Sequence, residues 1–509
     1  MKRMKKFLAV LTAGVMCAGA LPLAAVSLPE MALSVSAEDL KYDRLSYDEN
    51  ADGTIKITDC DESASGKLEI PAEIDGKPVT GIGAYAFFSC KGLTGISIPD
   101  RVTSMEERAF WDCASLTEIT IPKSVTSIGK HAFAECANLT KVTISEGVTS
   151  IGNSAFEECT SLTEITIPES MTSIGDYAFQ KCTSLTEITI SEGATSIGNY
   201  AFYSCTSLTE ISIPESVESI GDMVFYKTPW LDLMQEKDPL VVVSDILVNA
   251  AAYKNSEFVI PDTVTKIAGR IFVDNHNGGS DDYPTFDRIV VPDHVTHIGN
   301  HAFAYVNAEQ IELPQHLDYL GYGAFQHNNT LTSITIPEGV TVLQYFDTNA
   351  NFPEGILSYC SRLHTVTLPS TLKKIEYGSF EGCSSLSDVY FNGTKEQWEN
   401  VRIDHYDGFC GSNAPLLDAV IHFADGTQTV RRGDIDGNDT LNATDVAQIL
   451  TYIARLAVGM DTTLTDDQLA AADIDGNGEI SSKDAAYLLT FIAQDGAGME
   501  PSWDTILGK

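Results

Sequence analysis

Two twelve-residue segments near the C-terminus carry oxygen-bearing side chains at intervals that suit a hard divalent cation. The first begins at Asp434 and the second at Asp473, 39 residues further along the chain. Positions 1, 3, 5 and 12 of each carry oxygen atoms and position 7 would offer a backbone carbonyl, which makes the flexible oxygen cage that Ca²⁺ prefers. The predicted ligands are Asp434, Asp436, Asn438, Thr440 and Asp445 in the first loop and Asp473, Asp475, Asn477, Glu479 and Asp484 in the second. The pattern therefore predicts two bound calcium ions.

Each loop runs directly into an apolar segment with the spacing of a helix. These segments are VAQILTYIARL after the first loop and AAYLLTFIAQ after the second, and ILTYIA matches LLTFIA almost side chain for side chain. The apolar residue at position 8 of each loop is placed to pack the loop onto its helix. The polar stretch before Asp434 cannot form an entering helix, so we expect exiting helices only, unlike a pair of ordinary EF-hands.

This duplicated pair, with Asp instead of Glu at position 12, resembles a type I dockerin of cellulosomal proteins over residues 433–498. The resemblance implies that the module docks onto a cohesin domain of a scaffoldin and attaches the protein to a cellulosome. The recognition positions 10, 11, 17 and 18 of the loops fall on Ala443, Thr444, Leu450, Thr451, Ser482, Lys483, Leu489 and Thr490. Positions 10 and 11 differ between the loops whereas 17 and 18 match, which argues against two interchangeable binding orientations.

The first loop departs from the expected pattern at position 6, where Asp439 replaces glycine. Aspartate adopts a left-handed backbone conformation at modest cost, so we expect this site to be weakened but not lost. The tripeptide Arg432-Gly433-Asp434 matches an integrin motif. Asp434 would be occupied as a calcium ligand, so cell adhesion through the motif is not predicted.

The region that precedes the calcium loops is built from one repeated unit. Leucine, phenylalanine and cysteine each return every 23 residues. The leucines are Leu93, Leu116, Leu139, Leu162, Leu185 and Leu208. A fixed period of this length is typical of a solenoid, in which no single coil buries its own apolar face and stability comes from stacking.

One unit shows how a coil is expected to fold. Ile119 and Ile121 would point inward from a short strand, with Glu118 and Thr120 pointing outward. Pro122 would end this strand because it has no N–H to donate to a ladder. The same alternation recurs in every unit, so the repeat predicts a row of equivalent outward positions along the solenoid.

The second half of the same unit is expected to turn the chain back. Gly129 would supply a tight turn, and Ala132, Phe133 and Cys136, at helical spacing, would close the coil with a short helical turn. Six cysteines share the repeat position of Cys136. Stacking would leave their Cβ vectors parallel instead of facing each other, which disfavours disulfides. We therefore predict free, buried thiols.

The pattern LTxIxIPxxVTSIGxxAFxxC resembles the bacterial surface-protein type of leucine-rich repeat over about residues 66–392. The resemblance implies an α/β solenoid, rich in strands with short helical turns, followed by a small all-α calcium-binding dockerin. The predicted parts are a signal peptide (1–37), a hairpin cap (38–65) with a turn at Asp52-Gly53, a solenoid (66–423) with insertions near 226–257 and 345–355, a linker (424–432), the dockerin (433–498) and a tail (499–509).

The N-terminus reads as a leader. Four basic residues precede an apolar run, and Val35-Ser36-Ala37 offers a small-residue cleavage site, as in a Sec-type signal peptide. No later stretch reaches the roughly 18 apolar residues that a membrane span needs. The net charge of −39 argues against nucleic acids and anionic membranes as partners. These features predict a secreted, extracellular protein.

The outward positions of the repeat strands form the candidate ligand face of the solenoid. They are Glu118, Thr120, Lys141, Thr143, Glu164, Thr166, Glu187, Thr189, Glu210 and Ser212. Solenoids use such extended faces for binding, although Thr and Glu also merely cover a solvated sheet. This row lacks the aromatic platforms that favour polysaccharides, so recognition of a protein is predicted first and binding of a plant polysaccharide second.

The sequence offers no assignable catalytic centre. His294, His297 and His301 lie close together, but in the repeat frame they occupy outward positions and are predicted to be surface histidines instead of zinc ligands. No common hydrolase or phosphate-binding motif occurs, and the many carboxylates supply no localised acid–base pair. We predict a non-catalytic protein. A glycoside hydrolase acting in polysaccharide catabolism is the third hypothesis.

Overall fold

The computed structural model describes residues 44–273, 283–345, 355–404, 413–429, 431–438, 440–462, 464–497, 499 and 503–507. The predicted signal peptide, Asp439 and most of the insertion predicted near 345–355 lie outside the described residues. All elements below belong to one compact unit that begins at Leu45. Among the described residues, no helix combines the length and the apolar character that crossing a bilayer requires.

A β-hairpin precedes the repeats. Strands β1 (Leu45–Glu49) and β2 (Ile55–Cys60) pair antiparallel. The turn is closed by the Gly53 N–H, which donates to the carbonyl of Asn50 at 2.9 Å, and Gly53 has a φ of +81° that favours glycine. Strand β2 also pairs in parallel with β5 (Lys77–Ile82), so the hairpin covers the end of the first sheet. The turn at Asp52-Gly53 is the one that the sequence predicts.

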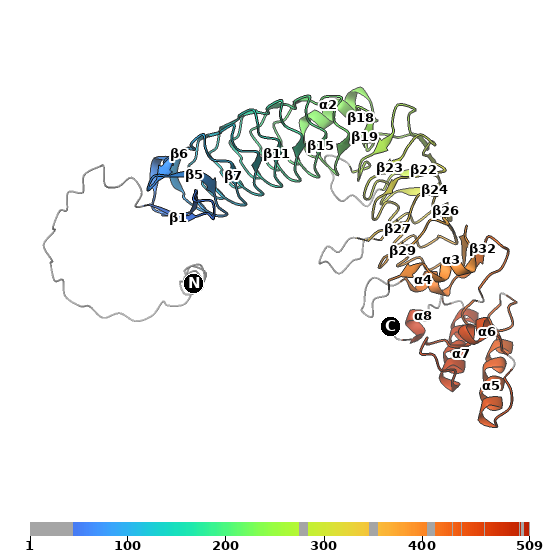
Figure 1. Ribbon diagram of the computed structural model, residues 1–509. Coiled ribbons are helices and arrows are strands. Elements are labelled where there is room, and N and C mark those ends of the chain that lie inside the picture. The colour runs from blue at the N-terminus through green and yellow to red at the C-terminus, as the bar shows by residue number, and fades with distance from the viewer. Residues whose placement is uncertain are drawn as a thin grey trace, which may run out of the picture. The chain divides into compact units, whose positions relative to one another are not determined.

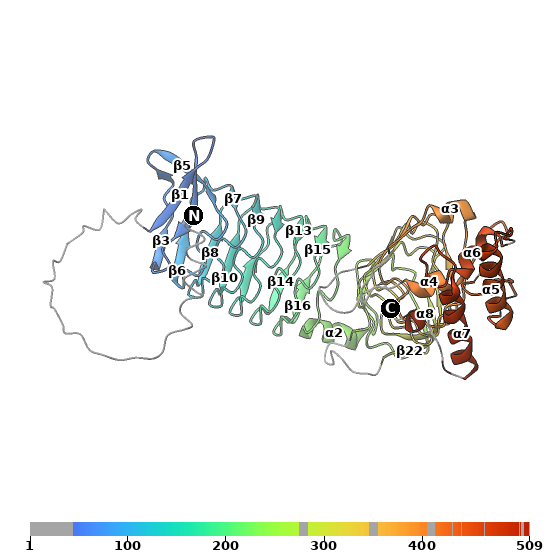
Figure 2. The same ribbon diagram turned by 90° about the horizontal axis from the view of Figure 1, so that it is seen from below.

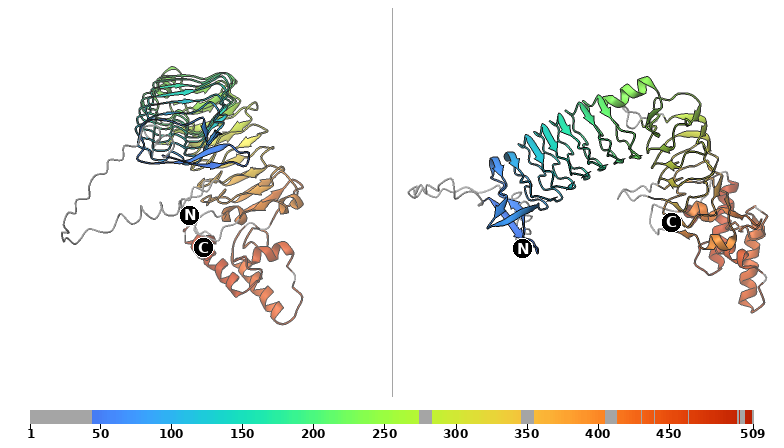
Figure 3. Two further views of the ribbon diagram at one scale, coloured as in Figure 1. Left: turned by 60° about the vertical axis from the view of Figure 1, so that its left-hand side comes forward. Right: turned by 45° about the horizontal axis from the view of Figure 1, so that its top comes forward.

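Each regular coil contributes two parallel strands, one to each of two faces. The longer strands are β3 (Ser65–Glu69), β6 (Gly92–Ser97), β8 (Glu118–Ile121), β10 (Lys141–Ile144), β12 (Glu164–Thr166), β14 (Glu187–Thr189) and β16 (Glu210–Ser212). The shorter ones are β7 (Ser104–Met105), β9 (Ser127–Ile128), β11 (Ser150–Ile151), β13 (Ser173–Ile174), β15 (Ser196–Ile197) and β17 (Ser219–Ile220), and β4 (Glu73–Ile74) pairs with β5. Figure 1 shows them as successive rungs, and Figure 3 shows the same rungs from two further sides.

The interior of the coils repeats one set of contacts. Phe156 is fully buried, and its ring stacks on those of Phe133 and Phe179 with centroids 5.4 Å away on both sides. The Cys159 thiol donates to the carbonyl of Phe133 in the preceding coil at 3.2 Å. Burial raises the pKa of this thiol to about 12. All nine cysteines among the described residues are free and buried, which confirms the prediction.

The turn that closes each coil differs from the expected helical turn. The N–H of Cys136 bonds to the carbonyl of Phe133 three residues earlier, as in a tight helical turn, but His131 and Glu135 have φ values of +52° and +61°. These left-handed residues interrupt any continuous right-handed helix, so the segment is a series of tight turns. Gly129 is required for another reason, because a Cβ there would lie 2.5 Å from the backbone of Glu106 in the preceding coil.

The predicted insertion at 226–257 folds onto the end of the regular coils. Thr228 occupies the repeat position of cysteine, and its hydroxyl donates to the carbonyl of Phe225 at 2.6 Å. The same oxygen caps helix α2 (Pro229–Lys237) by accepting the N–H of Leu231. Strands β18 (Val241–Val243) and β19 (Ile246–Asn249) follow, and β19 pairs in parallel with β21 (Lys266–Ile267), so the stack resumes within the insertion.

The later coils keep the two-strand plan with less regular lengths. Their strands are β20 (Glu257–Val259), β21 (Lys266–Ile267), β22 (Thr285–Val290), β23 (His297–Ile298), β24 (Asn307–Glu312), β25 (Tyr319–Leu320), β26 (Ser333–Thr335), β27 (Val342–Leu343), β28 (Thr365–Leu368), β29 (Lys374–Ile375), β30 (Asp388–Phe391), β31 (Arg402–Ile403) and β32 (Val420–Phe423), with helices α3 (Lys395–Glu399) and α4 (Ala414–Asp418). Strands β30, β31 and β32 thus extend the stack, and residues 424–429 fold back along β32 through the bond from the Thr429 N–H to the carbonyl of Ile421.

The C-terminal module is helical and has its own core. Helices α5 (Ala443–Ala457) and α7 (Ser482–Gly496) pack against each other (Figure 2). Buried side chains from these two helices, from both loops and from two shorter helices form the core: Ile435, Val446, Ile449, Ala472, Ile474, Ala485, Leu488 and Trp503. Helix α6 (Asp466–Ala472) leads straight into the second loop, so the expectation of exiting helices only is wrong there. Helix α8 (Trp503–Leu507) comes from the predicted tail.

Candidate calcium and partner-binding sites

The first loop gathers three carboxylates at the start of α5. Oxygens of Asp434, Asp436 and Asp445 all lie within 4.8 Å of one another. Asp445 is fully buried, and one of its oxygens accepts the N–H of Ile435 at 2.8 Å while the other accepts that of Asn442 at 3.0 Å. Asp445 is also the third residue of a capping box with Asn442, so the start of the helix fixes this carboxylate against the loop.

The second loop repeats this arrangement before α7. Oxygens of Asp473, Asp475 and Asp484 lie within 4.8 Å of one another, and Asp484 is fully buried. The N–H of Ile474 donates to one oxygen of Asp484 at 2.9 Å. Gly478 has a φ of +82°, and its N–H donates to Asp473 at 2.7 Å, which bends the loop around the carboxylates.

Positions 5 and 7 of the loops complete the predicted ligand sets. Asn438 and Asn477 accept the N–H groups of Thr440 and Glu479 at 2.9 and 2.7 Å, so each amide is held over its own loop. Thr440 and Glu479 are exposed, in keeping with a role for the backbone carbonyl at position 7. The predicted donors in both loops are therefore oxygens, the chemistry that suits calcium.

The electrostatics of the first loop favour a cation. The pKa of Asp436 is raised above its ordinary value by desolvation and by the charges of Asp445 and Asp434. A divalent ion at the centre of these carboxylates would offset their mutual repulsion. The residues present thus fit a calcium ion by donor type, number and convergence.

The eight predicted recognition positions all lie on the surface of the module. Leu450 and Leu489 are 48% and 54% exposed, although both are large apolar side chains. The hydroxyls of Thr451 and Thr490 donate to the carbonyls of Ala447 and Ala486, one helical turn earlier. The two helices therefore present matching leucine–threonine pairs to solvent.

The end of α5 exposes further apolar surface that the sequence pattern does not predict. An open hollow of about 410 Å³ is lined by Leu450, Thr451, Ala454, Arg455, Val458 and Met460. Val458 and Met460 are 67% and 60% exposed. The second copy has Ala497 at the position that Val458 occupies in the first copy. Aligning the two copies of the sequence therefore shows that the larger apolar side chain belongs to the first copy only.

The predicted ligand face of the solenoid runs over two sheets, one that contains β8, β10 and β12 and one formed by β14 and β16, and its residues are in register within each. In strand register, Lys141 lies opposite Glu118 on one neighbouring strand and opposite Glu164 on the other. Glu187 lies opposite Glu210 in the same way. Nine of the ten predicted side chains are exposed and Thr143 is half-buried. Lys141 Nζ lies 2.5 Å from Glu164 Oε1, whereas the chain has no lysine or arginine between residues 181 and 227. The charged side chains on the later rungs of the row, Glu187 and Glu210, are therefore all acidic.

A groove of about 1160 Å³ lies at the N-terminal end of this face. Gly95 occupies the position of Glu118 one rung earlier, so no side chain fills the row there. Lys67 extends across Gly95, and its Nζ lies 4.0 Å from Glu118 Oε1. Thr120 and Lys123 also line the groove. Sequence periodicity alone does not show this hollow, because Gly95 reads as one deviation among many.

Exposed aromatic rings gather on the turn edge of the first coils and not on the strand row. Tyr85 and Phe88 are 41% and 39% exposed, and the Phe88 ring lies 5.3 Å from that of Trp111. The Arg108 guanidinium lies over both the Tyr85 and Trp111 rings at 5.5 and 5.1 Å. Its Nη1 donates to the Tyr85 hydroxyl at 2.7 Å. These four residues are termed the aromatic patch.

The three clustered histidines occupy different environments. His294 and His297 are half-buried, but His301 is 2% exposed, so its prediction as a surface histidine is wrong. The His301 ring packs edge-on against Tyr322 and fills the space left by Gly323, where a Cβ would lie 2.4 Å from Nδ1. Among the described residues, the clusters of possible metal ligands contain none of these three histidines.

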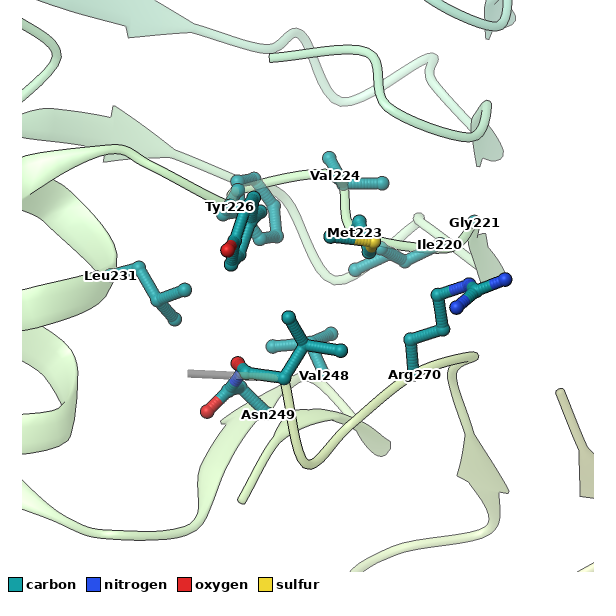
Figure 4. A pocket seen from close by; sticks show the side chains of 11 residues that line it. Ile220, Gly221, Met223, Val224, Tyr226, Leu231, Val248, Asn249 and Arg270 are labelled. Carbon is teal, nitrogen blue, oxygen red and sulfur yellow. The ribbon is translucent and has the colours of Figure 1, made fainter. Parts of the chain in front are cut away.

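Two further candidates carry no site. Asp434 is 1% exposed and Arg432 pairs with Asp418 at 3.0 Å, so the integrin-like tripeptide is engaged within the protein. A cavity of about 20 Å³ between the regular coils and β19 holds no more than about one water. Figure 4 shows Tyr226, Leu231 and Val248 around it.

Comparisons with known proteins agree with this geometry. The family described as BspA type leucine rich repeat region matches residues 67–182, 126–247, 249–350 and 281–402, and the dockerin type I domain matches residues 432–492. Both are non-catalytic families, and type I dockerins are calcium-binding domains whose partners are cohesins. No curated protein matches the chain significantly.

Solved structures of bacterial leucine-rich repeat proteins are also similar to the chain. A leucine rich cell surface protein from Faecalibacterium prausnitzii is 25% identical, with 72% of this chain and 97% of that chain covered and a TM-score of 0.37. A leucine-rich repeat protein from Bacteroides ovatus is 22% identical, with 71% and 98% covered and a TM-score of 0.34. The repeats and their family match show that this chain belongs to the BspA type leucine-rich repeat family and carries a C-terminal type I dockerin domain.

Proposed function

We propose that this protein is a secreted, non-catalytic subunit of a cellulosome, held there by its dockerin. The observation that carries the proposal is the pair of loops that each bring three carboxylates within 4.8 Å at the start of a helix. Calcium bound in both loops would neutralise these carboxylates and fix each loop against its helix. The predicted ligands of each ion are the five residues named above for its loop.

The cohesin would contact the exposed face that the recognition positions form on α5 and α7. Leu450 and Leu489 supply apolar area that is unusual for a solvent-exposed helix, and such area is a mark of partner-binding surfaces. Thr444 and Lys483 occupy position 11 of the two loops, so partner contact and ion binding would occur in the same part of the module. A cohesin-bound dockerin places the protein outside the cell.

The contact face is tested by placing charge on it. Leu450→Asp with Leu489→Asp should reduce binding to a panel of recombinant type I cohesins by at least about 100-fold, because central apolar anchors dominate such interfaces. The calcium-dependent rise in melting temperature should persist, since neither side chain is a predicted ligand. Glu187→Gln on the solenoid is the matched control. Full binding by the double variant would refute the proposed face.

For the solenoid, we infer a protein ligand that carries basic side chains. Glu187 and Glu210 lie directly opposite each other on neighbouring strands, and like charges at this spacing are unfavourable without a partner. A lysine- or arginine-rich segment along the row would offset that repulsion. The groove beside Gly95 offers apolar and mixed-charge surface at one end of the same face. Binding should therefore weaken steeply as salt is added.

The aromatic patch favours a second candidate, binding of plant polysaccharide. Aromatic platforms are absent from the strand row, but Tyr85 and Phe88 expose rings beside the fixed guanidinium of Arg108. The test is co-sedimentation of the chain with insoluble plant cell wall, compared with Tyr85→Ala/Phe88→Ala. Retention that the variant loses would support polysaccharide binding. Released sugar would support a hydrolase, and a chain that stays in solution would support the protein ligand.

A further inference from the structure

Two cysteine thiols meet where the N-terminal hairpin touches the first coil. Cys60 ends strand β2 of the hairpin, Cys90 closes the turn of the first coil, and both thiols are free and buried. Their Sγ atoms lie 3.7 and 3.9 Å from the same carbonyl oxygen, that of Asp61. This oxygen also accepts the N–H of Ala64 at 2.8 Å, so a tight turn fixes it beside the two sulfur atoms.

The later repeat cysteines each have an acceptor of their own. The thiol of Cys113 donates to the carbonyl of Phe87 at 3.1 Å, and that of Cys136 donates to the carbonyl of Phe110 at 3.2 Å. The same contact with an earlier coil recurs at Cys159, Cys182, Cys205, Cys360 and Cys383. Cys90 is the first of the series, and the oxygen that it approaches is the one that it shares with Cys60, at a longer distance.

The thiols of Cys60 and Cys90 also contact each other. A hydrogen bond between them, together with burial, raises the pKa of the Cys90 thiol above its ordinary value. Cys60 comes from the hairpin and not from the repeat, so the parallel Cβ vectors that disfavour disulfides within the repeat do not apply to this pair. Cys113 and Cys136 approach each other as well, but both belong to the repeat and each keeps its own carbonyl.

We propose that Cys60 and Cys90 form a disulfide that joins the hairpin to the first coil when the chain folds in contact with an external disulfide. The thiolate of one cysteine attacks the external S–S bond and releases one thiol, and the second cysteine then attacks the mixed disulfide and releases the other. Two S–H bonds are replaced by one S–S bond, and the external disulfide takes up two electrons and two protons. This chemistry does not depend on attachment to a cellulosome.

The disulfide closes before the hairpin is fully packed. Cys60 and Cys90 are 2% and 0% exposed, so the folded protein shields both sulfur atoms from an external disulfide. The raised pKa of Cys90 also keeps it as a thiol in the folded protein, whereas the thiolate is the attacking form. Closure therefore accompanies folding, and the same burial then protects the S–S bond from reductants.

A covalent attachment of the hairpin matters because each coil of a solenoid depends on its neighbours. The first coil has the hairpin on its outer side, and a terminal cap protects the apolar edge of a solenoid. The hairpin is held by the pairing of β2 with β5 and by the ion pair between Lys56 and Glu106 at 3.0 Å. A bond between Cys60 and Cys90 would add a constraint that lowers the entropy of the unfolded chain and resists detachment of the hairpin.

The first test maps the bonds that form during folding. The full chain is synthesised in a cell-free system, once with a mixture of oxidised and reduced glutathione and once with dithiothreitol. Free thiols are alkylated under denaturing conditions, and the digest is analysed by mass spectrometry. With oxidised glutathione, we expect a peptide pair that links Cys60 to Cys90, while Cys113 and Cys136 are alkylated. Alkylation of Cys60 and Cys90 to the same extent as Cys159, or a link between Cys113 and Cys136 in their place, would overturn the proposal.

Thermal melting of the same two preparations tests the effect on the solenoid. The solenoid transition of the oxidised chain should lie about 5 °C above that of the reduced chain, because the disulfide constrains the unfolded state. Cys60→Ser should abolish this difference, and Cys90→Ser should do the same from the other side of the bond. Cys113→Ser, at the next repeat position, is the matched control and should keep the difference. Equal melting of the oxidised and reduced unaltered chain would overturn the stabilising disulfide.

Discussion

The solenoid and the dockerin module obtain their stability from different sources. In the solenoid, one apolar cluster runs from Leu45 to Phe423 and every coil adds the same buried side chains. In the described part of the module, the apolar core consists of the eight residues given above, and the two loops bring like charges together. We therefore expect stacking to sustain the first region without a ligand, and we propose that the second needs a cation to complete its fold.

Calcium removal should separate the two regions most clearly. Chelation with EDTA should abolish the unfolding transition of the module, because the clustered carboxylates would then lack their counter-charge. The solenoid transition should stay within about 1 °C, since no predicted calcium ligand lies in it. Differential scanning calorimetry of the full chain in calcium and in EDTA measures both transitions. A solenoid transition that also falls with EDTA would contradict the separation.

Truncation of one stacked ring should have the next largest effect, and only in the solenoid. Phe156 is fully buried between Phe133 and Phe179, so Phe156→Ala should destabilise the solenoid by about 3–5 kcal/mol. Guanidinium denaturation monitored by circular dichroism measures this loss. The calcium-dependent transition of the module should be unchanged, and a shift there would show that the regions unfold together.

Glycine is required at Gly129 by a close backbone contact and at Gly478 by a left-handed backbone conformation, and substitutions should separate these two reasons. Gly129→Ala places a Cβ 2.5 Å from the backbone of Glu106 and should cost about 1–3 kcal/mol of solenoid stability, whether or not calcium is present. Gly478→Ala meets no atom within 4 Å but has a φ of +82°, so it should cost about 1 kcal/mol and lower calcium affinity. Thermal melts with and without calcium measure both, and equal calcium sensitivity would contradict this assignment.

The smallest effect concerns a buried carboxylate of the solenoid. Burial raises the pKa of Asp222, against the lowering effects of Asn300 and Arg270. Because its folded pKa lies above the unfolded value of about 3.9, the folded state loses stability as the pH rises from that value through the folded pKa. Asp222→Asn should remove this loss. Melting in EDTA between pH 3.5 and 7 tests it, and an unaltered pH profile would contradict it. Glu187→Gln is the exposed control.

Much of the fold follows from the sequence because its period is nearly invariant. The alternation at Ile119 and Ile121 sets the strand faces, and the shared position of the cysteines predicts their free thiols. The second sheet was missed because its strands, such as β9, have only two residues and give no alternation. The left-handed turn at His131 was missed because histidine gives no glycine signal there.

The module illustrates the same limit. Helix α6 was missed because it has only seven residues, although Thr465 and Gln468 form a capping box that the sequence displays. The oxygen positions of the loops were readable because calcium chemistry dictates their spacing. The contact between Lys483 and Asp475 joins residues eight positions apart across a loop, and no pattern of residue types encodes it. The ligand of the solenoid cannot be predicted from the sequence for the same reason, because it depends on surface side chains, such as Phe88 on the turn edge, that follow no repeat pattern.

The central claim is that calcium held by the two loops makes the module competent for cohesin. Its most direct test is calorimetric titration of a type I cohesin into the full chain, in calcium, in EDTA, and with Asp434→Ala/Asp473→Ala. We predict binding by the unaltered chain in calcium, and none in EDTA or by the double variant at any calcium concentration. Equal cohesin binding under all three conditions would contradict the claim.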